Sequence, residues 1–196
     1  MHDFPLYFEL GWQHICDWQG YDHILFVTAL CGVYLLADWR KVLILVTAFT
    51  IGHSLTLALS ALNVLHINTS LIEFLIPVTI VITSFINITR KKRSPSTVKL
   101  TYALALFFGL IHGLGFSNYL KSLLGKSQNI VPQLFAFNIG LEFGQLLIVT
   151  VVLLLAFVML NLMRIQRREW TLFLSSAIFG IALIMCIERY QLIHFR

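Results

Sequence analysis

The chain has 196 residues, of which 58% are hydrophobic and only 12% are charged. A soluble globular protein is nearer half apolar and a quarter charged, so this composition excludes that class and is typical of an integral membrane protein. The formal net charge of +5 does not indicate a nucleic-acid partner, because the cations lie in short loops between apolar blocks. We therefore expect one integral membrane domain over residues 1–196.

The first segment, residues 1–20, carries Phe4, Phe8, Trp12 and Ile15 at helical spacing. This stripe predicts a short amphipathic helix that lies in the membrane interface, and a helix folded back onto the bundle is equally compatible with it. Six apolar blocks follow, each long enough to cross a bilayer, which takes about 20 residues per helix. The fold class predicted is therefore an all-α polytopic membrane bundle with six transmembrane helices. The expected spans are about 22–38, 41–62, 70–89, 99–120, 132–160 and 170–190.

Lysine and arginine residues predict the orientation of these spans, since cytoplasmic loops are enriched in both. The loops after the first, third and fifth spans hold most of them, whereas the opposite side holds few and the first 39 residues hold none. Both termini are therefore predicted to lie outside. The first group is Arg40, Lys41, Arg90, Lys91, Lys92, Arg93, Lys99, Arg164, Arg167 and Arg168, and the second is Lys121, Lys126, Arg189 and Arg196.

Several polar side chains fall inside the expected spans, where they cost free energy and are usually functional. With the predicted orientation, all of them fall in the outer half of the membrane, which random placement would not produce. We therefore predict one polar site at the outer end of the bundle. The residues concerned are Asp22, His23, His53, His112, Asn138 and Glu142.

The residue types at this end suit a transition-metal ion such as nickel or zinc, because imidazole is a good ligand for both and a carboxylate offsets their charge. We expect His23, His53 and His112 to supply nitrogen, and Asp22 or Glu142 to supply oxygen. A lone buried histidine is often only hydrogen-bonded to a neighbouring helix, but three at one depth beside carboxylates favour a site.

Other residues are candidates for supporting roles. His14 could reach the site if the N-terminal segment folds over it. Asn138 and Gln145 share a helical face with Glu142, and Thr50 shares one with His53. We expect Asn138, Gln145 and Thr50 to orient the ligands.

Four stretches of the chain carry a family resemblance: YDHILF at 21–26, FTIGHSLTLA at 49–58, GLIHGLGF at 109–116 and FNIGLEFGQ at 137–145. They resemble the HupE/UreJ family of bacterial membrane proteins, and the similar layout covers essentially the whole chain. The resemblance implies a nickel permease of the bacterial inner membrane, accessory to hydrogenase or urease, with His14, Asp22 and His23 tied to metal uptake. The nickel permeases keep a shorter, His-Pro-containing spacing before the Asp-His pair. Here the stretch reads HICDWQGYDH, which is closer to a poorly characterised branch of the family.

Three functions are compatible with these residues. The first is a permease or accessory protein for nickel or a similar divalent ion, although no polar relay in the inner half and no internal repeat are visible. The second is a membrane-embedded zinc-dependent hydrolase that acts on a lipid or lipid-linked substrate from the outer leaflet, with Glu142 or Asp22 as general base. The third is a metal sensor or accessory subunit. The expected partners are a metal ion and membrane lipid, and the sequence leaves the oligomeric state open.

Overall fold

The computed structural model of the chain describes residues 4–65, 68–89, 95–124 and 130–194, and these residues form helices and connecting turns with no strand. Two short non-α elements lie among the seven α-helices, a 3-10 turn labelled η1 and a π-helical turn labelled η2. The elements are α1 (Phe4–Cys16), α2 (Asp22–Cys31), η1 (Leu36–Asp38), α3 (Trp39–Ala61), α4 (Thr69–Thr89), α5 (Pro95–Leu124), α6 (Val131–Phe157), η2 (Val158–Leu162) and α7 (Arg167–His194).

Five helices in the described part of the chain are long and apolar enough to cross a membrane. The prediction of an all-helical membrane bundle is confirmed in this form. The spans are Leu36–Ala61, Thr69–Thr89, Lys99–Leu123, Val131–Leu162 and Arg167–Ile193.

The six-span count is not confirmed, because the first expected span, 22–38, is not one helix. α2 has ten residues and is therefore about 15 Å long, half the thickness of the hydrocarbon core. The helix ends where side chains of α7 take over the backbone carbonyls that a further turn would have used. Trp170 Nε1 donates to the Gly32 carbonyl at 3.0 Å, and Arg167 donates to the Val33 carbonyl at 3.0 Å.

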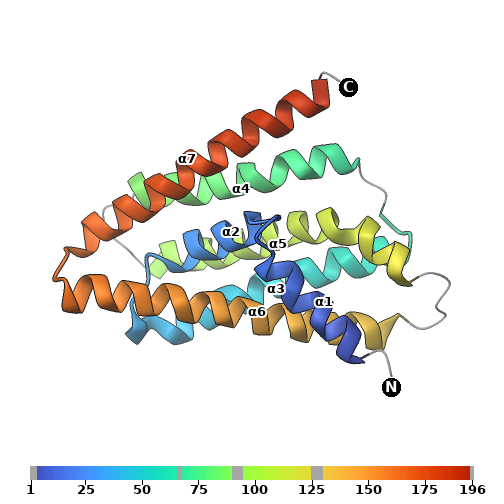
Figure 1. Cartoon of the computed structure of the whole chain (residues 1–196), viewed down its shortest axis with the longest axis horizontal. Coiled ribbons are helices and arrows are strands. Elements are labelled where there is room, and N and C mark those ends of the chain that lie inside the picture. The colour runs from blue at the N-terminus through green and yellow to red at the C-terminus, as the bar shows by residue number, and fades with distance from the viewer. Residues whose placement is uncertain (1–3, 66–67, 90–94, 125–129, 195–196) are drawn as a thin grey trace.

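α1 and α2 follow one another through the bundle, and the helix is interrupted between them at residues 17–21. Figure 1 shows α1 entering from the end where the N-terminus lies and α2 continuing toward the opposite end, with residues 17–21 between them. α1 packs closely along α6, since a Cβ added at Gly140 would overlap the Phe8 carbonyl oxygen and one at Gly11 would overlap the Phe137 carbonyl oxygen. α1 is therefore folded onto the bundle, and its buried residues are Tyr7, Gly11 and Ile15, of which only Ile15 belongs to the predicted stripe.

α3 and α5 form the most extensive helix pair in the bundle, and glycine allows their close approach. A Cβ added at Gly109 would overlap the Phe49 carbonyl oxygen, and one at Gly113 would overlap the His53 carbonyl oxygen. Because His112 lies between these two glycines, the close contact also sets how near His112 and His53 come to each other.

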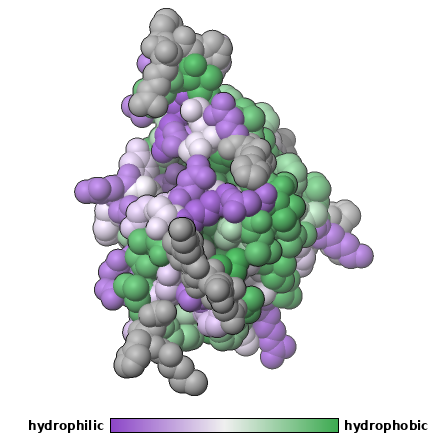
Figure 2. Space-filling model, turned by 90° about the vertical axis from the view of Figure 1, so that its right-hand side faces the viewer, coloured by the Kyte–Doolittle hydropathy of each residue, from purple (hydrophilic) through white to green (hydrophobic). Residues whose placement is uncertain are grey.

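The two ends of the bundle differ. The starts of α3, α5 and α7 lie at one end, whereas the start of α1 and the end of α7 lie at the other (Figure 1). Figure 2 views this second end, where hydrophilic residues cross the middle and hydrophobic residues flank them. The basic run at 90–93, on which the orientation prediction partly depends, lies outside the described residues.

Hydrogen bonds link the start of α7 to the end of α4, and α4 in turn to α2. Arg168 donates to the carbonyl of Ile88 at 2.6 Å and to that of Asn87 at 3.4 Å, and these are among the last carbonyls of α4. Asn87 in turn donates to the Ala29 carbonyl of α2 at 2.8 Å. α2, α4 and α7 are thereby joined at one end of the bundle.

We expect Arg168→Ala to lower the free energy of unfolding by about 1 kcal/mol, because two charge-assisted hydrogen bonds are lost at an exposed position where solvent weakens them. Unfolding in mixed micelles with increasing denaturing detergent measures this. Arg168→Lys keeps the charge but not the planar fork, so it should fall between wild type and Ala. An Ala variant as stable as wild type would show that these bonds do not stabilise the fold.

Candidate metal centre

Four imidazole rings gather where the break between α1 and α2 meets α3 and α5. His14 belongs to α1, His23 to α2, His53 to α3 and His112 to α5. The ring centroid of His23 lies 4.5 Å from that of His14, 5.0 Å from that of His112 and 6.2 Å from that of His53. Rings that share one ion stand on the order of 5 Å apart, since a metal–nitrogen bond is about 2.0–2.1 Å long. The spacing of the rings therefore fits a shared ion.

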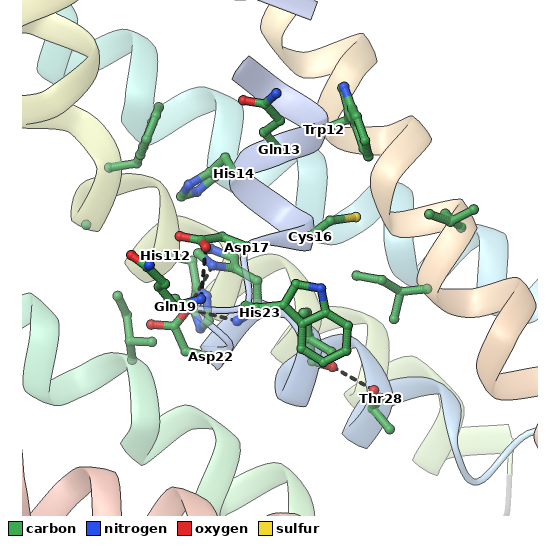
Figure 3. A pocket seen from close by; sticks show the side chains of 18 of the residues that line it. Trp12, Gln13, His14, Cys16, Asp17, Gln19, Asp22, His23, Thr28 and His112 are labelled. Carbon is green, nitrogen blue, oxygen red and sulfur yellow. Dashed lines mark hydrogen bonds and ion pairs between the residues drawn. The ribbon is translucent and has the colours of Figure 1, made fainter. Parts of the chain in front are cut away.

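Asp22 positions the ring of His23. Its Oδ1 atom accepts a hydrogen bond from His23 Nδ1 at 2.9 Å and another from the His23 backbone N–H at 2.8 Å. In a neutral ring whose proton is on Nδ1, the lone pair is on Nε2. A carboxylate behind a histidine in this way fixes the ring and strengthens it as a metal ligand. Figure 3 shows Asp22, His23, His14 and His112 around the same space.

Several buried nitrogens of this cluster have no hydrogen-bond partner among the described residues. They are Nε2 of His14, Nε2 of His23, Nδ1 of His112 and both ring nitrogens of His53. The side chains of His53 and His112 are fully buried. Leaving a buried polar atom without a partner costs about 1–3 kcal/mol, so such a concentration favours a site for a bound ion or bound water. Lone pairs of neutral imidazoles beside a carboxylate suit a divalent transition-metal ion.

As the side chains are placed in the structure, the ring nitrogens of the four histidines do not converge on one point. In the part of the chain that the structure describes, no group of three or more His, Cys, Asp or Glu side chains could hold a metal ion as placed. His53 has no hydrogen-bond partner among the described residues, whereas His23 and His112 contact Asp22 and Thr79. Binding an ion would therefore require the rings of His53 and His14 to turn toward the two fixed ones.

Three of the remaining predicted residues, Thr50, Glu142 and Gln145, lie where α3 contacts α6. Thr50 donates to Oε1 of Gln145 at 2.8 Å, and Thr47 donates to the Glu142 carboxylate at 2.9 Å. Glu142 does not line the cavity at the histidine cluster. Nε2 of Gln145 and Oδ1 of Asn138 are buried without a partner among the described residues.

The depth of the cluster differs from the prediction. Asp22 and His23 were expected to begin a span at the outer surface, but they follow the break that lies partway along the bundle (Figure 1). The reason is that α1 has already entered the bundle before residue 22. The site is therefore inside the bundle and not at its outer end.

A partly open cavity of about 1270 Å³ adjoins the cluster and includes Asp22, His23 and His112 in its wall. Leu147 and Val151 of α6 also line it and are about half exposed, so the cavity opens sideways along α6. On the side of α2, three rings close the space beyond the histidines: Phe26 lies 5.0 Å from Phe49 and 5.9 Å from Phe108 between ring centroids.

Sequence reasoning missed two parts of this site. Thr79, whose Oγ1 atom lies 3.1 Å from Nε2 of His112, is a single threonine in an apolar span and carries no pattern. The break at 17–21 was also missed, although Asp17 and Gly20 are residues that favour turns.

Comparison with known proteins gives one match. The family model described as HupE / UreJ protein matches residues 1–189. No curated protein and no solved structure matches the chain.

Proposed function

The chain belongs to the HupE/UreJ family, and from this premise we propose that it binds a divalent transition-metal ion at His14, His23, His53 and His112 and passes it across the bacterial inner membrane. The ion is the substrate, and nickel is the first candidate, as the family implies. One observation carries the proposal: buried imidazole nitrogens from four helices lack partners among the described residues and lie within reach of one another.

The surroundings of the cluster support a path with one open side. The adjoining cavity gives access to His23 and Asp22, whereas the aromatic cluster of Phe26, Phe49 and Phe108 closes the way toward the other end. Transport would require this cluster to move. The basic residues predict that the end of the bundle where both termini lie is the outer one.

Purified protein reconstituted in liposomes tests the proposal. We expect about one Ni²⁺ bound per chain and uptake of Ni²⁺ into the liposomes above the protein-free rate. His53→Ala and His112→Ala should reduce uptake to the protein-free rate, because each removes a buried donor. Metal analysis of the eluted protein and uptake of radioactive nickel are the two measurements.

The outcomes separate the candidate functions. If Ni²⁺ binds tightly but never enters the liposomes, the permease half of the proposal fails and an accessory or sensing role replaces it. If neither Ni²⁺ nor Zn²⁺ binds, metal binding itself is wrong.

A second candidate is a zinc-dependent hydrolase for a lipid or lipid-linked substrate. The observation in its favour is the size of the cavity and its sideways opening along Leu147, Val151 and Leu155. A single ion does not need an apolar wall of this kind, whereas an acyl chain would lie against it. His23, His53 and His112 would hold zinc, which would supply a polarised water, and Asp22 is the carboxylate nearest to them. Zinc-dependent release of fatty acid from phospholipid vesicles, with no metal uptake, would favour this function.

A further inference from the structure

Besides Asp22, which faces Nδ1 of His23, Thr79 of α4 contacts a ring nitrogen of the histidine cluster and bears on which nitrogen that ring can offer. We propose that Thr79 fixes the tautomer of His112 so that Nε2 carries the proton and Nδ1 is the atom left to bind the metal ion. The metal-binding part of this proposal rests on the function proposed above, whereas the tautomer does not.

The geometry around Thr79 is specific. Its side chain is buried, with 2% of its surface exposed. The Oγ1 atom lies 2.6 Å from the carbonyl oxygen of Ile76, in its own helix, and 3.1 Å from Nε2 of His112 in α5. Both distances are those of real hydrogen bonds.

The direction of the two bonds follows from the number of protons. A threonine hydroxyl has one proton to donate and lone pairs to accept with. The carbonyl of Ile76 can only accept, so the hydroxyl proton must go to it in the shorter bond. The contact with His112 can then be a hydrogen bond only if Nε2 carries a proton and donates it to Oγ1.

The other tautomer would be unfavourable on the Thr79 side of the ring. It would place the lone pair of Nε2 against a lone pair of Thr79 Oγ1, and it would leave a proton on Nδ1. That Nδ1 atom is buried and has no acceptor among the described residues. Because Nδ1 lacks a partner in both tautomers, the contact at Nε2 decides between them: one tautomer makes a buried hydrogen bond to Thr79 and the other loses it, a difference of about 1–3 kcal/mol.

His112 and His23 would therefore offer different ring nitrogens to a metal ion. Asp22 occupies Nδ1 of His23 and leaves Nε2, whereas Thr79 occupies Nε2 of His112 and leaves Nδ1. Both free atoms are buried without a partner in the described part of the chain. Their rings lie 5.0 Å apart between centroids, at an interplanar angle of 77°. These two fixed donors form the pair toward which the other rings would turn.

The test uses metal-free and Ni²⁺-loaded full-length protein in lipid bilayers. Nitrogen-15 solid-state NMR of labelled histidine reports which ring nitrogen is protonated, and the His112 signal is identified by its loss in His112→Gln. We expect metal-free wild type to show a proton on Nε2 of His112. Thr79→Val removes the hydroxyl at similar volume, so the ring should become a mixture of tautomers and the affinity for Ni²⁺ should fall about 10-fold or more, as when an outer-shell partner is lost.

Two variants control for a merely structural effect. Thr79→Ser keeps the hydroxyl and should restore both the tautomer and the affinity. Thr83→Val, one turn along α4, removes another buried hydroxyl that bonds only a backbone carbonyl, that of Thr79 at 2.8 Å. It should change neither.

The outcomes separate this inference from the proposed function. A proton on Nδ1 of His112 in metal-free wild type overturns the Thr79 assignment, and this measurement needs no variant to fold. So does a Thr79→Val variant with the wild-type tautomer and affinity. If wild type shows the expected tautomer but binds no Ni²⁺, the tautomer assignment is supported, and the proposed function and the role of Nδ1 as a ligand both fail.

Discussion

His23→Ala lowers the affinity for Ni²⁺ by about 100-fold or more, the upper end of what the loss of an outer-shell partner alone costs. The reason is the position of His23 within the cluster. Its ring is the one found near the other three, at 4.5 Å from His14, 5.0 Å from His112 and 6.2 Å from His53 between centroids. Asp22 also holds this ring in place, so the variant loses a nitrogen donor that is already oriented. Competition of the purified protein against a nickel-binding dye measures the affinity.

Two further variants serve as comparisons for His23→Ala. Asp22→Asn keeps the size of the side chain but not its charge, so we expect a smaller loss, within about 10-fold to 100-fold. Gln13→Ala changes an exposed residue of the same cavity whose side chain bonds Glu9, and its affinity should match wild type. Nickel binding by His23→Ala at the wild-type affinity would contradict a site centred on this ring.

Gly113→Ala should destabilise the protein by about 1–3 kcal/mol, as overpacking does in a tight core. The added methyl group would overlap the carbonyl oxygen of His53 and lie against Oγ1 of Thr56, and neither backbone nor buried threonine can move away cheaply. α3 and α5 must separate to make room. Because His53 and His112 lie on these two helices, nickel binding should weaken as well.

Gly180→Ala is the matched control for this variant. Gly180 also lies within a helix, but nothing lies within 4 Å of a Cβ placed there. The same substitution should therefore stabilise the protein by roughly 0.5–1 kcal/mol through the helix propensity alone. Unfolding of both variants in mixed micelles gives the comparison. Equal stability of the two would show that the close approach of α3 and α5 is not tight.

The grouping of the histidines could be predicted from the sequence because depth is a simple count along each span. His53 and His112 lie far enough from the ends of α3 and α5 for an error of several residues not to matter. The ends of the first span could not be predicted in this way. An apolar block of sufficient length looks the same whether it is one helix or, as here, a short helix that ends at Gly32 under the side chains of α7. Contacts from distant segments decided that boundary.

The sequence also could not predict which side chains hydrogen-bond to one another across two helices. The pattern that linked Asn138, Glu142 and Gln145 gave their shared helical face, but not the residues opposite it. Glu142 accepts a hydrogen bond from Thr47, and Gln145 accepts one from Thr50, because of how α6 lies against α3. The role of Thr79 depends in the same way on one hydroxyl meeting one ring across two helices.

The broken path of α1 and α2 also constrains the order in which the protein can assemble. α1 leaves the ribosome before the other described helices, yet it packs along α6, which is synthesised more than a hundred residues later. Neither α1, with 13 residues, nor α2, with ten, is long enough to cross a bilayer alone. Among the described helices, α1 therefore waits longest for the helix it packs on, and we expect His14 to join the other three rings only when α6 is in place.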